Sequence, residues 1–260
     1  MYWLLEDLRE RDGVVSPPLA KRELEDYVTV TLLRLLGYRW PEQDAYEAEH
    51  GPILDSTVVD ADGIIPLAPC GDEPTAEARI RDQLERQFGD EGAETFLRDF
   101  RKYVGRDLAE WLRRDFFKRH VQQFKSRPIA WHLRSPESAF EAFVLYHRLS
   151  RATLVKLRAE YAGPRIARLK VEAARAKERG NDRLAADLQV QVEDIEAFRR
   201  QLEAIERGDE LRDRIRCRWK DETAAGRPGP YAPEIDDGVK VNIRPFQEGG
   251  LLTTKVISKW

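Results

Sequence analysis

The sequence has 260 residues, of which 42% are hydrophobic and 35% charged, with 16 Gly and 14 Pro. This balance is typical of a globular chain of one or two domains, and it excludes collagen-like and wholly disordered chains. Cys70 and Cys217 lie far apart, which excludes a disulfide framework or a zinc ribbon, so we expect a reducing, cytoplasmic setting. No run of 18 apolar residues occurs and the N-terminus lacks a basic start, so we expect no membrane contact.

The net charge of −3 hides an uneven distribution of charge along the chain. Residues 1–100 carry 10 Lys and Arg against 23 Asp and Glu, residues 101–170 carry 17 against 6, and residues 171–260 carry 17 against 18. The basic block is a candidate surface for nucleic-acid phosphates, with the acidic part facing away from them or toward a protein partner. The alternative is a helix-rich segment whose arginines are solvated or paired with acids elsewhere in the chain.

Helical periodicity dominates the first 125 residues. Apolar residues three and four apart predict a helix over residues 19–36, and Ser16 is a suitable start signal. Residues 39–74 are rich in Pro, Gly and Asp, and they predict a long ordered loop with a strand or two around Ile64. Further helices are predicted over residues 75–88, 93–103 and 107–125. The last of these is capped by Asp107 and is expected to be central to the core.

The next part of the chain predicts an extended segment followed by another helix. Pro128 and its neighbours favour an extended conformation over residues 126–133. Ser135 and the proline after it are typical of a helix start. The helix is predicted because four residues fall at helical spacing: Phe140, Phe143, Val144 and His147. His147 is therefore interpreted as a hydrogen-bonded core histidine.

A long antiparallel helical hairpin is predicted over residues 152–207, with a coiled-coil seam between its arms. Its turn is expected at residues 178–181, where Gly and Asn suit a helix end, and Pro164 predicts a kink. After a polar linker at residues 224–233, residues 239–243 alternate between apolar and polar and predict a half-buried strand.

These elements predict a mainly α fold with a small β component (α+β). The expected architecture is a helical core with a long, coiled-coil-like helical hairpin. We expect a mainly helical domain over residues 1–150, the hairpin over residues 151–223, and a linker with a C-terminal strand segment over residues 224–260.

The sequence contains few candidates for catalytic or metal-binding residues. None of its four histidines has metal-ligand spacing, and the GxSxG, GxxxxGK and GxGxxG motifs are missing. Asp55, Asp60 and Asp62 superficially resemble a calcium loop, but the other ligands do not follow, so a capped turn is expected. Asp236, Asp237 and Lys240 have the wrong spacing for a nuclease site. We therefore assign no catalytic, cofactor-binding or metal-binding residue.

Several short motifs occur in an order that resembles one family. They are DGIIP (62–66), RDFF (114–117) followed by His120, KSRPIAW (125–131), VLYHRL (144–149), TLVKLRAEY (153–161) and DDGVKVNIRPF (236–246). The sequence resembles the adenine-specific DNA methyltransferases of bacterial anti-phage systems, the PglX type of BREX and the related enzymes of DISARM. Order and spacing match from about residue 19 to the end. Ala130 and His132 depart from the aromatic or aliphatic residues common there, which bears on packing more than on chemistry.

The resemblance does not extend to a catalytic domain. In this family S-adenosylmethionine is held by a Gly-containing loop after the first strand of a doubly wound sheet, and an Asn/Asp-Pro-Pro-aromatic loop grips the flipped adenine. The sequence has neither motif, because its only Pro-Pro pair, Pro17-Pro18, lies between Ser16 and Leu19. We therefore expect the C-terminal region of a longer methyltransferase, either a fragment or a split-gene product, which binds no cofactor and is inactive alone.

Two functions follow from this interpretation. The first is a DNA-contacting and scaffolding region of a restriction-modification-like defence methyltransferase, with double-stranded DNA and the catalytic domain, in cis or in trans, as partners. The candidate phosphate contacts are Lys125, Arg127, Arg148, Arg158, Arg165, Arg168, Arg175 and Arg179. The spacing of the last five places them along one side of a helix. The alternative is a protein-interaction module that docks other components of the defence complex.

Overall fold

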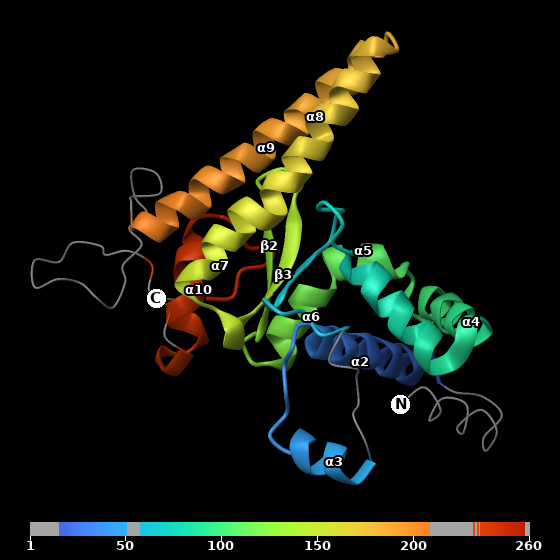
Figure 1. The fold of residues 1–260 in the computed structure, drawn as a ribbon. Coiled ribbons are helices and arrows are strands. Elements are labelled where there is room, and N and C mark those ends of the chain that lie inside the picture. Colours follow the sequence, from blue (N-terminus) through green and yellow to red (C-terminus); the bar gives the residue numbers. More distant parts are fainter. Residues whose placement is uncertain (1–15, 51–57, 209–230, 232, 234, 258–260) are drawn as a thin grey trace, which may run out of the picture.

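The structure is a computed structural model that describes residues 16–50, 58–208, 231, 233 and 235–257. The predicted fold class is confirmed, because the chain is mainly helical and contains one small antiparallel sheet (Figure 1). None of the helices in the described ranges is long and apolar enough to cross a lipid bilayer.

The elements run in the following order along the described residues. The helices are α2 (Pro17–Leu35), α3 (Gln43–His50), α4 (Ala76–Val104), α5 (Leu108–Arg114), α6 (Phe116–Gln123), α7 (Arg151–Lys156), α8 (Gly163–Glu178), α9 (Asp182–Arg207) and α10 (Val239–Glu248). The strands are β1 (Ile64–Pro66), β2 (Ala130–Arg134) and β3 (Glu141–Leu145). The shorter turns are the 3₁₀ turns η2 (Tyr146–Arg148) and η4 (Ile235–Asp237) and the π-helical turn η3 (Leu157–Ala162).

The sheet has the strand order β1-β3-β2, and both pairings are antiparallel. Val144 of β3 lies opposite Ile64 on one side and Trp131 on the other. The outer edge of β2 is also covered, because Leu133 bridges Leu252 and the chain after α10 runs along this strand. The central strand therefore has backbone partners on both sides.

The predicted helix after Ser135 is wrong, because its residues form the central strand β3. Every residue of β3 is buried, so the strand has no polar face to show the alternation that marks a half-buried strand. His147 is not a core histidine, since it is exposed in η2 with its ring 5.1 Å from that of Tyr38. The histidines in the core are His120 and His132.

The predicted strand at residues 239–243 is also wrong, because these residues begin α10. Val239, Ile243 and Phe246 are buried on one side of this helix, at the spacing of a helical face. The short alternation of Val and Ile within this stretch mimics a strand. Val241 exposes 42% of its surface on the opposite side.

Three other boundaries differ from the prediction. The helix predicted over residues 107–125 is divided at Asp115 into α5 and α6, although Asp107 caps α5 as expected by accepting from the Glu110 amide at 2.8 Å. The two helices predicted over residues 75–103 form α4, with an interruption at Gly89, where φ is 68°. Helix α3 lies in the region predicted to be a loop.

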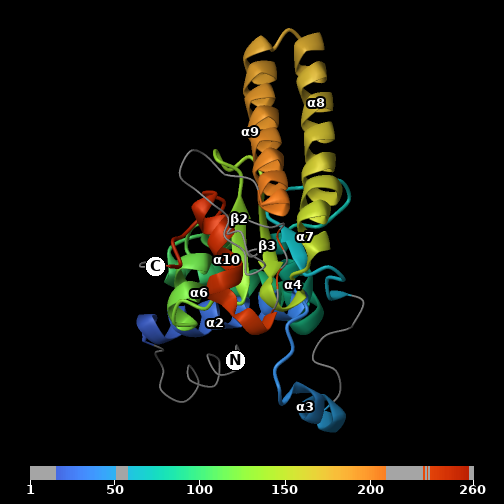
Figure 2. The ribbon, with the colours of Figure 1, turned by 90° about the vertical axis from the view of Figure 1, so that its left-hand side faces the viewer.

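The predicted helical hairpin is confirmed. Helices α8 and α9 run antiparallel and project away from the sheet (Figures 1 and 2). Gly180, with φ of 75°, forms the turn, and the Asn181 side chain caps α9 by accepting from the Leu184 amide. Pro164 lies in the first turn of α8, directly after the π-helical turn η3. The linker predicted at residues 224–233 lies almost wholly outside the described residues.

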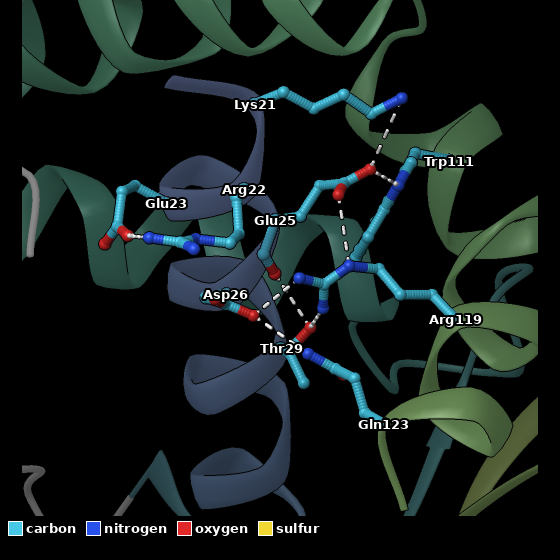
Figure 3. A network of polar contacts seen from close by, with 9 residues as sticks. All are labelled: Lys21, Arg22, Glu23, Glu25, Asp26, Thr29, Trp111, Arg119 and Gln123. Carbon is cyan, nitrogen blue, oxygen red and sulfur yellow. Dashed lines mark hydrogen bonds and ion pairs between the residues drawn. The ribbon is translucent and has the colours of Figure 1, made fainter. Parts of the chain in front are cut away.

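A buried carboxylate attaches α2 to the helices beside it (Figure 3). Glu25 exposes only 8% of its surface, and it accepts hydrogen bonds from Trp111 Nε1 at 3.1 Å and from Arg119 Nε at 3.0 Å. Arg119 also donates to Asp26 at 2.6 Å. Because a buried carboxylate needs such partners, these contacts specify how α2 docks onto α5 and α6.

His120 connects α6 to the start of β2. Its Nε2 accepts the backbone N–H groups of Ile129 and Ala130, each at 3.1 Å, so this nitrogen carries no proton. Burial lowers the pKa of His120 to about 3, and the neighbouring positive charge of Arg119 acts in the same direction. The folded chain therefore holds a neutral imidazole in a position where protonation would break both hydrogen bonds.

This arrangement predicts a pH dependence of stability. Unfolded His120 titrates near its ordinary pKa of 6.5, whereas the folded side chain stays neutral down to about 3. The unfolded state binds one more proton between these values, so the free energy of unfolding falls as the pH falls. His120→Gln keeps an acceptor for the two amides but does not titrate. The free energy of unfolding of this variant, measured with denaturant, should fall less steeply below pH 6 than that of the unmodified chain. The two slopes should differ by about 1.4 kcal/mol per pH unit. Parallel curves for the two proteins would contradict this prediction.

Candidate nucleic-acid interface

The hairpin is anchored to the sheet through a buried aspartate on α9. Asp194 exposes 7% of its surface and accepts from Ser135 Oγ at 2.5 Å, from the Glu137 amide at 2.8 Å and from the Ala139 amide at 3.0 Å. All three donors belong to the connection between β2 and β3. The base of the hairpin is therefore attached to the sheet, while its tip extends from the molecule (Figure 2).

The eight basic residues predicted to contact phosphate lie in different parts of the molecule. Lys125 and Arg127 are exposed between α6 and β2, in a segment where Lys125 has φ of 49°. Arg148 donates to the backbone oxygens of Asp60 at 2.5 Å and Ala61 at 2.9 Å, and its guanidinium packs against Gly37. Arg148 thus holds two segments of the chain together.

Arg158 lies in η3 and faces the second arm of the hairpin. It forms an ion pair with Glu206, and its Nη1 lies 3.9 Å from a carboxylate oxygen of Glu203. Only 20% of its side chain is exposed. Arg158 therefore follows the alternative given by the sequence, in which arginines of the basic block pair with acids elsewhere in the chain instead of contacting phosphate.

Arg165 and Arg168 lie near Arg113 of α5, and we call these three residues the hairpin-base arginines. Burial lowers the pKa of Arg165, and the positive charges of Arg168 and Arg113 also lower it, whereas Cys70 and Glu172 raise it. Arg168 pairs with Glu172 at 3.0 Å and remains 49% exposed. Arg113 donates to Leu67 O at 3.0 Å, forms an ion pair with Glu141 at 3.5 Å and remains 44% exposed.

Arg165 differs from the other two in its pairing. Its Nε is buried without a hydrogen-bond partner, and within the described ranges Arg165 forms no ion pair. A half-buried guanidinium that forms no ion pair of its own and lies beside two further arginines is an electrostatically unfavourable arrangement that an anion would relieve. Sequence reasoning missed Arg113, although it lies in the basic block and directly precedes the RDFF motif.

Arg175 and Arg179 are exposed toward the end of α8, where the hairpin turns. They are four residues apart and Arg175 follows Arg168 by seven, so these three side chains share one side of the helix as the spacing predicts. The exposed part of the predicted row therefore continues from the hairpin-base arginines toward the tip.

The remaining polar residues do not form a metal or nucleophile site in the described part of the chain. No group of three or more His, Cys, Asp or Glu side chains there could hold a metal ion. Asp60 accepts the amides of Asp62 and Ile64, which is the capped turn predicted for this segment. Burial raises the pKa of the Cys70 thiol to about 12, so this cysteine is not poised to react. Asp55 and Cys217 lie outside the described residues.

Comparison with known proteins shows that the sequence is similar to one class of enzyme. The chain is 31% identical over 202 residues to the adenine-specific methyltransferase BrxX of Escherichia coli O9:H4 (strain HS). The overlap covers 72% of this chain and 16% of that protein, so the chain spans less than a fifth of its relative's length. No family model matches the sequence. The similarity supports the relation to adenine-specific methyltransferases that the motifs predict.

The anchor of the hairpin can be tested by substitution. Asp194→Ala removes three hydrogen bonds and leaves the buried Ser135 hydroxyl and two backbone amides of the β2–β3 connection without this acceptor. We expect it to lower the free energy of unfolding by about 3 kcal/mol in a urea titration. The matched control is Asp187→Ala at an exposed position of the same helix, which should change it by less than about 0.5 kcal/mol. Equal effects of the two substitutions would show that Asp194 does not anchor the hairpin.

Proposed function

We propose that the chain is the C-terminal, non-catalytic region of an adenine-specific DNA methyltransferase of an anti-phage defence system. In this proposal the hairpin-base arginines contact duplex DNA, and the anchored hairpin braces the catalytic part of the enzyme. The observation that carries the proposal is the half-buried guanidinium of Arg165, whose Nε has no hydrogen-bond partner among the described residues and which lies beside Arg168 and Arg113. The relation to the adenine-specific methyltransferase BrxX supports the class of enzyme.

The chemistry of arginine favours phosphate as the ligand of this cluster. Its planar guanidinium donates in parallel to two oxygens of a phosphate, and it stays charged when it is partly buried. The attachment of α9 through Asp194 gives the cluster a defined position, so little ordering is required on binding. Arg175 and Arg179 extend the positive charge along α8. Such contacts supply affinity without reading the base sequence.

The described residues do not fit the family's S-adenosylmethionine site. That site is formed by a Gly-containing loop at a doubly wound parallel sheet, whereas the sheet described here is antiparallel. The adenine-gripping motif is also missing from the sequence. In this proposal the cofactor is bound by a separate catalytic domain, in cis or in trans.

A specific observation favours a second function, the docking of other defence-system proteins. Large apolar side chains are exposed on the hairpin, with Val171 at 51%, Leu184 at 45% and Val190 at 58% of their surface. The pairing of Arg158 with Glu203 and Glu206 also neutralises one of the predicted phosphate contacts. Under this alternative the hairpin contacts protein and the arginines serve only the fold.

The DNA contact is tested by replacing Arg113, Arg165 and Arg168 together with Gln. Removing one phosphate contact should reduce the slope of log affinity against log salt concentration by about 0.9, so we expect a decrease of about 2 to 3 in a fluorescence-anisotropy series with duplex DNA. The effect should not depend on the DNA sequence, because phosphate contacts carry no base information.

The matched control replaces three arginines of α4, Arg81, Arg86 and Arg98, with Gln. All three lie in the acidic first hundred residues, on a helix well separated from the hairpin (Figure 1). This variant should retain the slope of the unmodified chain. An unchanged slope in the hairpin-base variant would favour the protein-docking function.

The absence of a cofactor site predicts a second result. Calorimetric titration of the chain with S-adenosylmethionine should show no binding, and the chain alone should transfer no methyl group to DNA. An intact adenine-specific methyltransferase serves as the positive control. Micromolar binding by this chain would contradict the assignment and reveal a donor site unlike that of the family.

A further inference from the structure

A polar cleft of about 500 Å³ lies between α2, the end of α4 and α6. These helices lie at the end of the molecule opposite the hairpin tip (Figures 1 and 2). The charged side chains that line it are Lys21, Glu25, Arg106, Asp115, Lys118 and Arg119. The lining thus contains four cationic side chains and two carboxylates. None of the four belongs to the hairpin or to the hairpin-base arginines.

The carboxylates and the arginines of this cleft neutralise one another. Glu25 is held by Arg119, which also reaches Asp26 (Figure 3). Arg106 contacts Asp115 at 2.6 Å and the nearby Glu110 at the same distance. These carboxylates thus engage the two arginines, and the ammonium groups that they leave largely available belong to Lys21 and Lys118.

The two lysines reach the cleft from opposite walls. Lys118 lies on α6 one turn before Gln122, which also lines the cleft, and across the described residues Lys118 forms no ion pair. Lys21 projects from α2, with its Nζ 4.0 Å from Glu25 Oε1 and 48% of its side chain exposed. The ammonium groups of Lys21 and Lys118 and the side-chain amide of Gln122 thus line the same cleft, and they have N–H groups available to bind a ligand.

From this geometry we propose that the cleft binds a phosphate group, held between Lys21 and Lys118. Its volume is in the range of small-ligand sites, but its charged lining suits a hydrated anion better than an apolar molecule. Lysine is a point charge with three donors that adapts to phosphate oxygens without a fixed geometry. The same chemistry is offered by the DNA backbone and by a free diphosphate, and the experiment distinguishes the two sources.

The test replaces Lys21 and Lys118 together with Gln in the full 260-residue chain. Inorganic pyrophosphate is titrated by calorimetry, and a short DNA duplex is titrated by fluorescence anisotropy at several salt concentrations. The double variant should bind the anion of the cleft about tenfold more weakly, because charge-assisted hydrogen bonds to it are removed. If that anion is DNA, the salt slope should also fall by about 1 to 2.

Two controls make the result specific. Lys240→Gln removes an exposed lysine of α10 outside the cleft and should leave both affinities unchanged. Lys118→Arg keeps the charge and should retain binding. Thermal melts establish that each variant is folded, which is expected because both lysines are solvent-accessible.

The results distinguish a free diphosphate from a DNA phosphate as the ligand of the cleft. They also distinguish the cleft from the proposed DNA contact of the hairpin-base arginines. Loss of pyrophosphate binding alone supports a free diphosphate, and loss of DNA affinity alone supports a backbone phosphate. The hairpin-base variant should keep its pyrophosphate affinity, since its three arginines lie outside the cleft. Unchanged binding of both probes in the double lysine variant, or an equal loss in Lys240→Gln, would overturn the proposal.

Discussion

The burial of the central strand β3 dictates how the other elements are arranged around it. All five of its residues are buried, so both of its edges need backbone partners and both of its faces need cover. Strands β1 and β2 provide the backbone partners. Trp131 of β2 is fully buried, with its ring 5.5 Å from those of Tyr146 and Phe246. A three-stranded sheet of this size is stable only because helices from both ends of the chain pack against it.

Buried polar groups then specify how those helices are placed. Glu25 positions α2 against α5 and α6, His120 fixes the entry into β2, and Asp194 attaches α9 to the connection between β2 and β3. Each of these groups has several partners, which is the condition for burying them without a large loss of stability. They give the hairpin and the α2–α6 region defined positions relative to the sheet.

This arrangement divides the basic residues into groups with different roles. Arg119, Arg148 and Arg158 are used by the fold, because each bonds to carboxylates or carbonyl oxygens of other segments. By contrast, Arg165 at the hairpin base and Lys118 in the cleft form no ion pair within the described residues. The two proposed anion sites lie on separate parts of the molecule. They offer one polyanion two points of contact, or they serve different ligands.

The helices with strong periodicity, the hairpin with its turn at Gly180 and the Asp107 cap could all be predicted from the sequence, because they depend on neighbours a few residues away. The sequence also indicated the basic block and the relation to adenine-specific methyltransferases. Tertiary structure alone decided that residues 141–145 form a strand and that residues 239–243 form a helix. A segment buried on every side loses its polar face, and five residues are too few to distinguish the two periods. Tertiary structure also decided which arginines are neutralised, because Arg113 meets Arg165, and Arg158 meets Glu206, only through contacts between residues about 50 positions apart.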